Sequence, residues 1–478
     1  MNDFLSLTAP ISPDRLALIT SDVEVTYAEL NHRVAVLCAQ LNARGIRSKD
    51  RIAVLLDRGP ASVELVHALA RLGAVIMPLN TRLTSAEMRW QIEQAECRCV
   101  LSALSGSVLE EAILLDDLPP VGDTGRWLNS NLNLDSDFGI LFTSGTTGKP
   151  KGALLTWGNI FWSATASAFR LGVLPTDRWL LSLPLHHIGG LAILFRSALY
   201  GTAVVLPDFP GDQFDLDHLW TRLHNGGVTL ISLVPTMLYR LLESYQRLDW
   251  PSTLRLILLG GAAATPKILQ AARAANLPVA VTYGLTEATS QVATADTEAT
   301  RSKPGSVGKP IQWSQVNIRD EEGHPLSAGE IGEIWVRGPM VMRGYLNNPE
   351  VKDWLQTGDL GYLDEDGDLW IVQRRSDLII SGGENIYPVE IEAVIRRQPA
   401  IEDVCVVGLP NAEWGQQVAA AVTLHPEHNL DEELLLSFCR QHMAGYKLPR
   451  KILILDTLPR TSSGKVQRDN VVNQFAEN

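Results

Sequence analysis

Residues 143–152 read Thr143-Ser144-Gly145-Thr146-Thr147-Gly148-Lys149-Pro150-Lys151-Gly152. Apolar runs at 138–142 and 153–155 flank this stretch, and each is predicted to be a buried strand. Glycines let backbone N–H groups approach an anion closely, hydroxyls donate hydrogen bonds and lysines supply positive charge. The composition therefore predicts a loop that holds a phosphate group. A polar surface turn is the alternative, but it requires these residue types to fall between two strands by accident.

This loop differs from the Walker phosphate loop, which has four residues between one glycine and a Gly-Lys-[Ser/Thr] unit. Here two residues separate Gly145 from Gly148, and Pro150 follows Lys149. The stretch therefore predicts phosphate binding by a loop of another type.

Length and composition limit the classes of protein to consider. A chain of 478 residues, with 45% apolar and 20% charged residues, is expected to be soluble and to have more than one domain. The net charge of −13 and the lack of a basic stripe argue against nucleic-acid binding as the main role. The start of the chain does not resemble a signal peptide, and no apolar run reaches about 18 residues, so we expect no membrane span.

The five cysteines are Cys38, Cys97, Cys99, Cys405 and Cys439. Cys97 and Cys99 are too closely spaced for a zinc knuckle, and no second pair accompanies them. Buried reduced thiols are therefore expected, which fits a cytoplasmic protein.

The chain up to Gly284 alternates between helix-like and strand-like patterns, which predicts parallel sheets covered by helices. Thr26 and Thr265 are expected to cap the helices that follow them. Residues 103–136 lack a clear pattern and are predicted to form a surface connection. The expected strands are 51–56, 74–79, 99–101, 179–183, 203–206, 228–234, 254–259 and 279–284, and the expected helices are 27–41, 61–72, 85–94, 190–200, 214–224 and those that begin at Pro235 and Pro266.

From about Gly305 the pattern changes to short apolar runs, glycines and acidic turns, which predicts a β-rich portion. The final part alternates again and predicts a compact α+β domain. The overall prediction is an α/β fold with an N-terminal domain of helix-covered sheets plus the β-rich portion (1–375) and a small α+β C-terminal domain (376–478). In the small domain, the expected strands are 378–380, 404–407, 418–424 and 452–455, and the expected helices are 389–397 and 431–442.

Polar side chains follow several of the expected strands, and open α/β sheets bind ligands at that edge. In Tyr283-Gly284-Leu285-Thr286-Glu287, the tyrosine can stack on a planar base, Thr286 can donate to a phosphate oxygen, and Glu287 is a hard ligand for Mg²⁺. Asp359 can accept both hydroxyls of a ribose, although an aspartate in an ordinary turn is the simpler interpretation of this residue alone.

Two further stretches carry little information on their own. Arg374 and Arg375 precede the turn Ser381-Gly382-Gly383, and they can hold a phosphate or a ribose or form a solvated charge pair. Lys465 lies in a run of small and polar residues, 458–466, which predicts a mobile loop with an exposed lysine.

Together, in this order and over nearly the whole chain, these stretches resemble the acyl-adenylate-forming superfamily of acyl-CoA synthetases, peptide-synthetase adenylation domains and luciferases. The resemblance implies ATP and Mg²⁺ as cofactors and a mobile C-terminal domain. The implied site residues are Thr143, Ser144, Gly145, Thr146, Thr147, Gly148, Lys149 and Lys151 for the β- and γ-phosphates, Gly261 and Tyr283 for adenine, Thr286 for the α-phosphate, Glu287 for Mg²⁺, Asp359 with Arg374 or Arg375 for ribose, Asp377 for the hinge and Lys465 for catalysis.

In such an enzyme a carboxylate attacks the α-phosphorus of ATP to give acyl-AMP and pyrophosphate, and a thiol then attacks the activated carbonyl. Two anions meet in the first step, so a cation such as Lys465 must offset the charge that develops. The resemblance implies that the small domain turns about Asp377, so that Gly382 and Gly383 line a channel for the thiol. No carrier-protein domain follows Lys465, so coenzyme A is the expected acceptor.

The segment Pro184–Gly190 bears on the identity of the acid. Relatives that activate amino acids usually have a Phe-Asp pair near this segment, whereas His186-His187 stands here. His187 matches a position beside the acyl pocket of aryl- and acyl-CoA ligases, where it is a catalytic and substrate-binding candidate. Two adjacent histidines are expected to face opposite sides of a strand, which argues against a paired metal site.

The segments 184–201, 283–291 and 374–388 are similar to those of the 2-succinylbenzoate–CoA ligases of menaquinone and phylloquinone biosynthesis, although Arg374 replaces the superfamily's usual glycine. The substrate of such ligases has two carboxylates: the succinyl one reacts, and the aromatic one must be recognised. A buried arginine needs an anion, so Arg196, in an apolar helix, is a candidate to bind the aromatic carboxylate. The list of candidates for polar pocket contacts also includes Ser290 and Gln291.

Several alternatives stay open. Arg196 can lie on the helix surface or pair with an internal acid, and the enzyme can act on another aryl or medium-chain acid. A non-catalytic nucleotide-binding relative is a third hypothesis, which Lys465, Glu287 and Asp359 disfavour. The expected partners are small molecules rather than nucleic acid, and the oligomeric state, with a homodimer among the options, is not fixed by the sequence.

Overall fold

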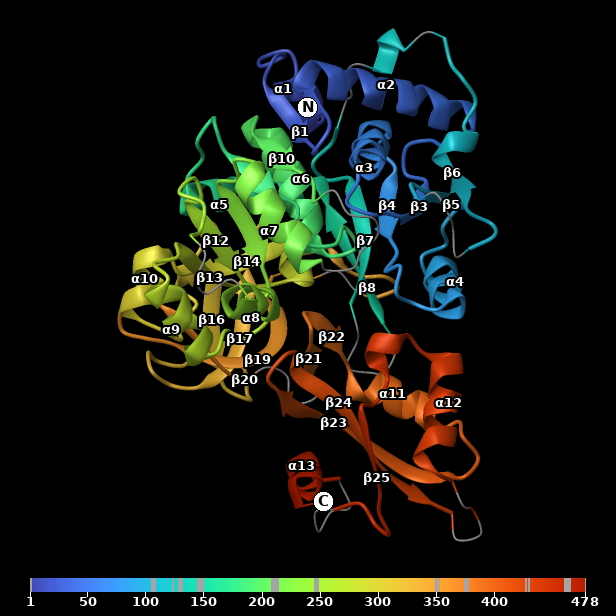
Figure 1. Cartoon of the computed structure of the whole chain (residues 1–478), viewed down its shortest axis with the longest axis vertical. Coiled ribbons are helices and arrows are strands. Elements are labelled where there is room, and N and C mark those ends of the chain that lie inside the picture. Colours follow the sequence, from blue (N-terminus) through green and yellow to red (C-terminus); the bar gives the residue numbers. More distant parts are fainter. Residues whose placement is uncertain are drawn as a thin grey trace. The chain divides into compact units, whose positions relative to one another are not determined.

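The computed structural model describes residues 2–104, 109–122, 124–127, 132–143, 150–207, 215–244, 249–348, 351, 353–373, 378–425, 428, 430–459 and 466–477 (Figure 1). The chain divides into two compact units. The first consists of Met1–Thr81, Ile92–Leu141 and Gly152–Gln373, and the second of Arg82–Gln91, Phe142–Lys151 and Arg374–Asn478. The predicted domain boundary, between 375 and 376, lies outside the described residues and stays a prediction.

The first unit contains a nine-stranded sheet whose central strands are parallel. Leu258 pairs in parallel register with Ser232 on one side and with Ala280 on the other. Antiparallel strands lie at both edges of this sheet. In order across the sheet, the strands are β15 (Lys309–Pro310), β14 (Ser290–Thr294), β13 (Val279–Leu285), β12 (Leu256–Leu259), β11 (Leu230–Leu233), β9 (Arg178–Leu180), β10 (Ala203–Val205), β1 (Leu16–Ile19) and β2 (Glu24–Thr26).

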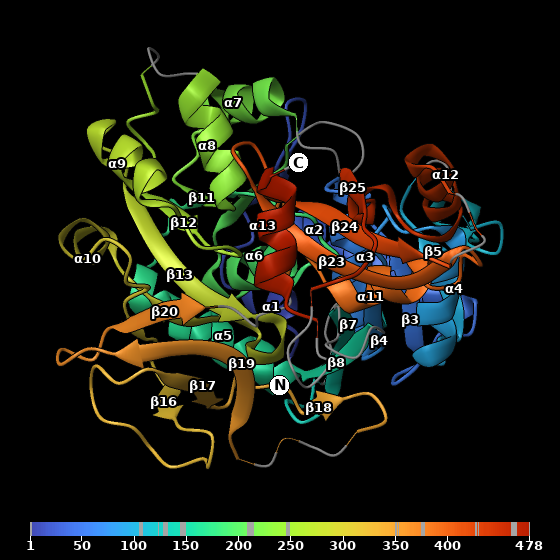
Figure 2. The same cartoon turned by 90° about the horizontal axis from the view of Figure 1, so that it is seen from below.

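Helices cover both faces of this sheet, because alternate residues of each strand point to opposite sides. Ile257 and Leu259 belong to one apolar core, whereas Leu256 and Leu258 belong to another. The first core includes the helices that lie on one side of β11, β12 and β13 in Figure 2. These helices are α7 (Leu216–Asn225), α8 (Pro235–Ser244) and α9 (Pro266–Ala274), and the other core includes α1 (Phe4–Thr8), α5 (Trp157–Leu171) and α6 (Ile188–Tyr200).

A second sheet, of seven strands, is parallel through β7, β4, β3, β5 and β6. Gly139 pairs with Ile76, and a Cβ at Gly139 would lie 2.7 Å from the Ile76 carbonyl oxygen, so only glycine allows this approach. The strands, in order, are β18 (Gly344–Tyr345), β8 (Lys151–Thr156), β7 (Asp137–Thr143), β4 (Val75–Pro78), β3 (Arg51–Leu55), β5 (Cys99–Ser102) and β6 (Ile113–Leu114), and the helices near them in sequence are α2 (Tyr27–Ala43), α3 (Pro60–Leu72), α4 (Ser85–Gln94), η1 (Leu115–Asp117) and η2 (Gly125–Trp127).

The β-rich portion is an antiparallel sheet of four strands in the first unit, which confirms that part of the prediction. A short helix, α10 (Thr297–Ser302), lies between the nine-stranded sheet and this one in sequence. The four strands, in order, are β16 (Gln315–Arg319), β17 (Gly332–Arg337), β19 (Leu355–Leu363) and β20 (Leu369–Gln373).

The second unit has a five-stranded mixed sheet with helices on both faces. Val404 and Val406 point to the face that carries α11 and α12, whereas Cys405 and Val407 point to the face that carries α13. Figure 1 shows α13 on the opposite side of β23 from α11. The strands are β22 (Glu384–Ile386), β21 (Ile379–Ser381), β24 (Gly415–Leu424), β23 (Ile401–Asn411) and β25 (Lys451–Ile454), and the helices are α11 (Pro388–Ile395), α12 (Glu432–His442), η4 (Gly445–Lys447) and α13 (Arg468–Glu477).

The α/β fold class and most of the expected elements are confirmed. The Thr26 hydroxyl accepts from the Glu29 N–H while the Glu29 carboxylate accepts from the Thr26 N–H, so the predicted cap is a full capping box. The predicted cap at Thr265 also forms. The elements that the sequence analysis did not predict include strands β1, β2, β14 and β15 and helices α1, α5, α10 and α13. No helix in the described part of the chain has the length and apolarity needed to cross a bilayer.

A single lysine contacts three carboxylates of the acidic turn between β19 and β20. Lys303 Nζ lies 2.9, 2.6 and 2.7 Å from carboxylate oxygens of Asp364, Asp366 and Asp368, respectively. Burial alone would raise the pKa of Asp364, but its hydrogen bonds, chiefly the one from Lys303, lower the pKa to about 2. The folded-state pKa lies below the ordinary value, so the stability that this carboxylate contributes is present near neutral pH and declines as the pH falls below about 5.

We expect Lys303→Met to lower the apparent melting temperature at pH 7, because Asp364, Asp366 and Asp368 would lose the cation that they share. The difference should narrow as the pH falls below about 5. Because the three carboxylates would then lack a cation, about 1 mM Ca²⁺ should stabilise the variant and leave the original protein unchanged. Calorimetry with and without Ca²⁺ measures both effects, and equal responses of the two proteins would contradict this account.

Candidate active site

Tyr283, near the end of β13, and Asp359, in β19, meet in the interior of the first unit. The Tyr283 hydroxyl donates to Asp359 Oδ2 at 2.7 Å, and both side chains are buried. Gly261 follows the adjacent strand β12 with a left-handed φ of +81°. The sequence analysis assigned Gly261 and Tyr283 to adenine and Asp359 to ribose. The structure places Tyr283 and Asp359 in direct contact.

The chain reverses abruptly after β13. Thr286–Ala288 form a 3-10 turn, η3, and the next two residues, Thr289 and Ser290, have left-handed φ values of +52° and +97°. A Cβ at Gly284 would lie 1.8 Å from the Ser290 carbonyl oxygen, so only glycine permits the close return of the chain. Such strained backbone persists where its surroundings hold it in place.

Hydrogen bonds from neighbouring elements hold this turn. The Ser163 hydroxyl of α5 donates to the Thr289 carbonyl oxygen at 2.5 Å, and the Thr289 hydroxyl donates to the Met340 carbonyl oxygen at 2.7 Å. Because α5 was absent from the sequence-based prediction, Ser163 was missed as well. The turn therefore presents Thr286 and Glu287 from a rigid support.

The carboxylate of Glu287, the predicted Mg²⁺ ligand, is half-buried and oriented by a tyrosine. The Tyr345 hydroxyl donates to Glu287 Oε1 at 2.7 Å. Sequence analysis did not single out Tyr345, which lies 58 residues further along the chain. The Glu287 carboxylate and the hydroxyl of the preceding residue, Thr286, both offer oxygen atoms. Mg²⁺ prefers oxygen ligands, so these residues fit a magnesium site.

The phosphate loop is described only at its ends. Thr143 closes β7 and Lys151 opens β8, which confirms the two flanking strands, and the Thr143 hydroxyl donates to the Lys151 carbonyl oxygen at 3.4 Å. Most of the loop and several other predicted site residues lie outside the described residues. These are Ser144, Gly145, Thr146, Thr147, Gly148, Lys149, Arg374, Arg375, Asp377 and Lys465.

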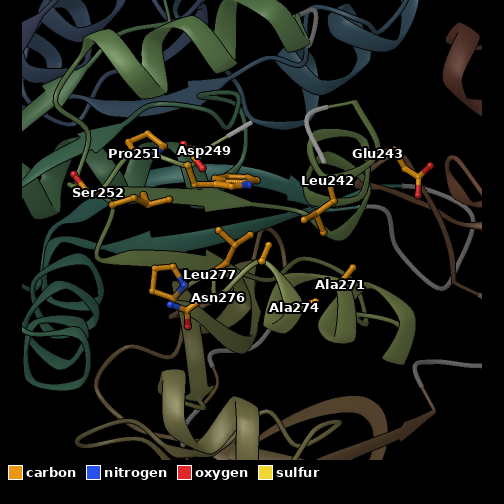
Figure 3. Close-up of a pocket in the computed structure, with 13 residues that line it drawn as sticks. Leu242, Glu243, Asp249, Pro251, Ser252, Ala271, Ala274, Asn276 and Leu277 are labelled. Carbon is orange, nitrogen blue, oxygen red and sulfur yellow. The ribbon is translucent and has the colours of Figure 1, made fainter. Parts of the chain in front are cut away.

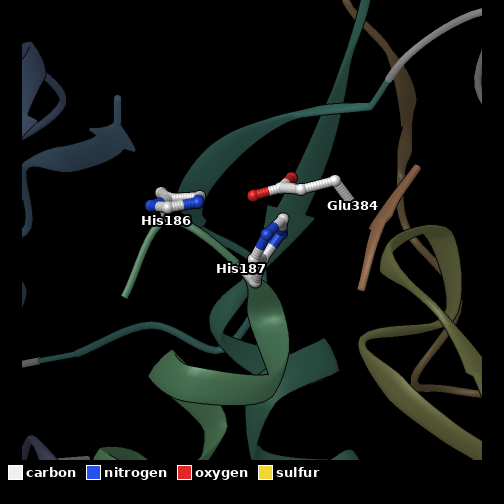
Figure 4. A group of neighbouring side chains, drawn as sticks. All are labelled: His186, His187 and Glu384. Atoms are coloured by element: carbon white, nitrogen blue, oxygen red, sulfur yellow. The ribbon is translucent and has the colours of Figure 1, made fainter. Parts of the chain in front are cut away.

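His186 and His187 lie on a turn before α6 rather than on a strand, because β9 ends at Leu180. Their ring centroids are 4.4 Å apart with an interplanar angle of 53°, and Figure 4 shows both rings at the start of the helix. The expectation that the two rings face opposite ways is therefore wrong, and so is the argument against a metal site that rested on it. Two imidazoles still fall short of the three or four protein ligands of zinc sites.

Arg196 is buried in α6 at 2% exposure, so the surface alternative is wrong. Its Nη2 donates to the Ser290 hydroxyl at 3.3 Å, and its guanidinium lies 5.7 Å from the Trp179 ring centroid. Among the described residues it forms no ion pair with an acid, and its Nε has no hydrogen-bond partner. Burial lowers the pKa of Arg196, which marks the guanidinium as incompletely compensated.

Two other buried arginines have more partners than Arg196. Arg71 pairs with the buried carboxylate of Asp3 at 3.1 Å, and Arg222 donates to two backbone carbonyl oxygens. Gln291, the next residue after Ser290, also has a buried Oε1 without a hydrogen-bond partner among the described residues, although its Nε2 donates to Thr294. Within the part of the chain that the structure describes, Arg196 therefore lacks a counter-ion.

In the second unit, Gly382 and Gly383 form the turn between β21 and β22, with left-handed φ values of +60° and +86°. A Cβ at Gly382 would lie 2.8 Å from Trp414 Cε3, so the turn requires glycine there. The role of these glycines in a thiol channel remains a prediction.

A cavity of about 870 Å³ lies between α8, α9 and the segment 249–254 (Figure 3). Its lining includes Trp250, Asp249 and Leu277 but none of the predicted site residues. Pro278 directly precedes β13, so the cavity lies at the amino ends of strands whose carboxyl ends carry Gly261 and Tyr283. Size alone therefore does not make it the active site.

Comparison with known proteins agrees with this geometry. A family model described as AMP-binding enzyme matches residues 7–346, and one described as AMP-binding enzyme C-terminal domain matches residues 390–465. The chain belongs to the AMP-binding enzyme family. It is 38% identical over 482 residues to a 2-succinylbenzoate–CoA ligase of Bacillus cereus (strain Q1), with 98% of this chain and 97% of that protein covered.

Two solved structures of o-succinylbenzoate CoA synthetase (MenE) from Bacillus subtilis also match this AMP-binding enzyme. A double mutant bound with its product analogue OSB-NCoA aligns with a TM-score of 0.89 and 38% identity, covering 98% of both chains. The complex with the acyl-adenylate intermediate OSB-AMP aligns with a TM-score of 0.73 and 37% identity, also covering 98% of both chains.

We expect Gly284→Ala to destabilise the protein, because its Cβ would overlap the Ser290 carbonyl oxygen and push the turn apart. Overpacking of this kind costs about 1–3 kcal/mol. Gly122→Ala is the control, since a Cβ at Gly122 would have no neighbour within 4 Å. Chemical denaturation of both variants measures the effect, and equal stability of the two would contradict the predicted clash.

Proposed function

We propose that this chain is an ATP-dependent acid–thiol ligase that converts 2-succinylbenzoate, coenzyme A and ATP to 2-succinylbenzoyl-CoA, AMP and pyrophosphate. The supporting comparison is the full-length similarity to ligases of that activity. The structural observation that carries the choice of acid is the buried guanidinium of Arg196, which lacks an acidic partner among the described residues. The product belongs to the synthesis of menaquinone or phylloquinone.

The reaction has two steps. An oxygen of the succinyl carboxylate attacks the α-phosphorus of ATP, and the bond from that phosphorus to the bridging oxygen of pyrophosphate breaks. The thiol sulfur of coenzyme A then attacks the carbonyl of the mixed anhydride, AMP leaves, and the thiol proton passes to solvent. Negative charge gathers at the α-phosphate in the first step, so catalysis there is mainly electrostatic.

At the nucleotide end, the ring of Tyr283 stacks on adenine, and Gly261 brings backbone to the base edge. Asp359 accepts the ribose hydroxyls, and the hydrogen bond from the Tyr283 hydroxyl holds its carboxylate in place at 2.7 Å. Arg374 or Arg375 assists at the ribose. One contact thus fixes the base-binding and sugar-binding residues relative to each other.

At the phosphate end, Glu287 holds Mg²⁺ and Thr286 donates to the α-phosphate. Mg²⁺, when bound, offsets charge on the phosphates and on the leaving pyrophosphate. The loop residues from Thr143 to Lys151 close over the β- and γ-phosphates. The turn between β13 and β14 holds Thr286 and Glu287 rigidly, so little reorganisation is needed when charge develops.

At the acid end, Arg196 binds the aromatic carboxylate, and the Ser290 hydroxyl, 3.3 Å from Arg196 Nη2, contributes a second polar contact. Gln291 lies next in the chain, and His187 lies beside the acyl group at the start of α6. A planar guanidinium suits a carboxylate, because it can donate two parallel hydrogen bonds. The substrate anion would thereby compensate a charge that the described residues leave unpaired.

The small domain, residues 376–478, completes the proposal. Lys465 bridges the attacking carboxylate and the α-phosphate, Asp377 is the hinge, and Gly382 and Gly383 line the path of the pantetheine arm. A cytoplasmic location fits the free thiols of all five cysteines. The assembly proposed is a homodimer, which sedimentation analysis would test.

We expect pyrophosphate release from ATP with 2-succinylbenzoate and far less with 4-oxo-4-phenylbutanoate, which lacks the ring carboxylate. Removing one partner of a buried ion pair costs about 3–5 kcal/mol, so Arg196→Met should lower kcat/KM for 2-succinylbenzoate by about 10²–10⁴-fold. Its effect on 4-oxo-4-phenylbutanoate should be small. A panel of acids, with and without coenzyme A, provides the measurement.

Two outcomes of that assay would contradict the proposal. Turnover of benzoate or octanoate without turnover of 2-succinylbenzoate would assign the enzyme to another acid. An equal loss with both keto acids in Arg196→Met would show that Arg196 does not recognise the ring carboxylate.

Lys465→Ala should abolish formation of the acyl-adenylate, because the developing charge loses its cation, while thioester formation from supplied acyl-AMP stays within about threefold. Lys451→Ala, at an exposed position of β25, is the control and should retain both half-reactions. Single-turnover assays of each half-reaction measure this. An equal loss in both half-reactions would contradict a role confined to the first.

A further inference from the structure

Tyr345 contacts the proposed metal ligand but belongs to none of the recognised site segments. Its hydroxyl donates to Glu287 Oε1 at 2.7 Å, and both side chains are half-buried. A carboxylate has about four lone-pair positions, so it can accept a hydrogen bond and also bind a cation. The contact therefore orients Glu287 without preventing metal binding.

The segment that carries Tyr345 also holds the backbone of Glu287. The Met342 N–H donates to the Glu287 carbonyl oxygen at 2.8 Å. The backbone carbonyl and the carboxylate of Glu287 thus accept hydrogen bonds from Met342 and Tyr345, two residues of the same segment. Together these two hydrogen bonds restrict the orientation of the Glu287 side chain.

This segment is in turn fixed to β8, the strand that follows the phosphate loop. Tyr345 pairs with Ala153, and the Leu346 N–H donates to the Gly152 carbonyl oxygen at 2.8 Å. A Cβ at Gly152 would lie 2.7 Å from Leu346 Cδ1 and 2.9 Å from Ile140 Cγ2, so a larger residue there would displace these side chains. Gly152, the last residue of the phosphate-loop motif, therefore has a packing role of its own.

A buried amide fixes the other end of the same segment. Asn159 Nδ2 donates to the carbonyl oxygens of Pro339 and Val341, both at 2.8 Å, while Asn159 Oδ1 accepts from the Thr156 N–H in the cap of α5. Residues 339–346 are thus held by α5 on one side and by β8 on the other. The Tyr345 hydroxyl projects from a support that has little freedom to move.

We propose that Tyr345 is a positioning residue for Mg²⁺, which acts by holding the Glu287 carboxylate in the orientation that the metal requires. This inference rests on the proposed function, because it assumes that Glu287 binds the metal. Groups that hydrogen-bond to a metal ligand fix its orientation, and their loss usually costs 10–100-fold in metal affinity or activity. A phenol suits this role because it is a neutral donor near pH 7 and does not compete with the cation by charge.

The decisive variant is Tyr345→Phe, which removes the hydroxyl and keeps the ring. The Mg²⁺ concentration for half-maximal pyrophosphate release should rise by about 10–100-fold, with a smaller change in kcat at saturating Mg²⁺. By calorimetry, ATP should bind more weakly to the variant when Mg²⁺ is present and equally well in EDTA. Tyr362→Phe is the matched control. The Tyr362 ring stacks on Trp370, with ring centroids 5.9 Å apart, so loss of this hydroxyl should leave the Mg²⁺ requirement unchanged.

A double variant separates positioning from mere packing. If Tyr345 acts through Glu287, adding Tyr345→Phe to Glu287→Gln should cause little further change in Mg²⁺-dependent ATP binding. An unchanged Mg²⁺ requirement in Tyr345→Phe, or a full additional loss in the double variant, would overturn the proposal. If no acid supports turnover, the proposed function fails, whereas the calorimetric comparison with and without Mg²⁺ still tests Tyr345.

Discussion

The close approach of Gly284 to Ser290 is the constraint on which the site depends. Because the Ser290 carbonyl oxygen occupies the position of a side chain at Gly284, the chain can reverse within a few residues and start β14 beside β13. Three functions are therefore carried by one short stretch. Tyr283 is the residue proposed for the base and Glu287 the one proposed for the metal, and Ser290 accepts a hydrogen bond from Arg196. A longer connection would separate these groups and would give each more freedom to move.

The proposed site contains a carboxylate, Glu287, and a buried guanidinium, Arg196, and their surroundings differ. Glu287 is the proposed ligand of a cation, and the hydroxyl of Tyr345 donates a hydrogen bond to its carboxylate. Arg196 is a cation in an apolar helix, and within the described part of the chain it contacts the Ser290 hydroxyl and the Trp179 ring but forms no ion pair with an acid. Burying a charge without a counter-ion is costly, and the cost is recovered when the missing ion binds. Arg71 is also a buried cation, but its counter-ion is Asp3 of the same chain, so no ligand is needed to compensate its charge.

Much of the fold followed from local sequence, because parallel strands and their helices leave strong patterns. Thr26 and Thr265 were found as caps since a cap is a local feature. Helix α5 was missed, although Thr156 and Asn159 form a capping box with asparagine in the place usually taken by glutamate or glutamine. His186 and His187 were placed on a strand because the prediction extended that strand past Leu180, where β9 ends. The apolar pattern of the sequence does not show where a strand ends. Tyr345 and Ser163 carry no local signal at all, since their partners lie 58 and 126 residues away.

The residues that sequence motifs reveal and those that they miss differ in what they touch. Motif residues such as Tyr283 and Glu287 are the ones proposed to contact a ligand, and residue type and spacing predict their chemistry. Ser163, Asn159 and Tyr345 face the backbone or a side chain of the site, and many residue types at many positions supply such contacts. Their identity becomes readable only once the fold shows which donor reaches which acceptor. Sequence motifs therefore predict which residues form the site, whereas the tertiary structure determines how they are oriented. Helix α5 and strand β8 fix residues 339–346, and these in turn fix Glu287.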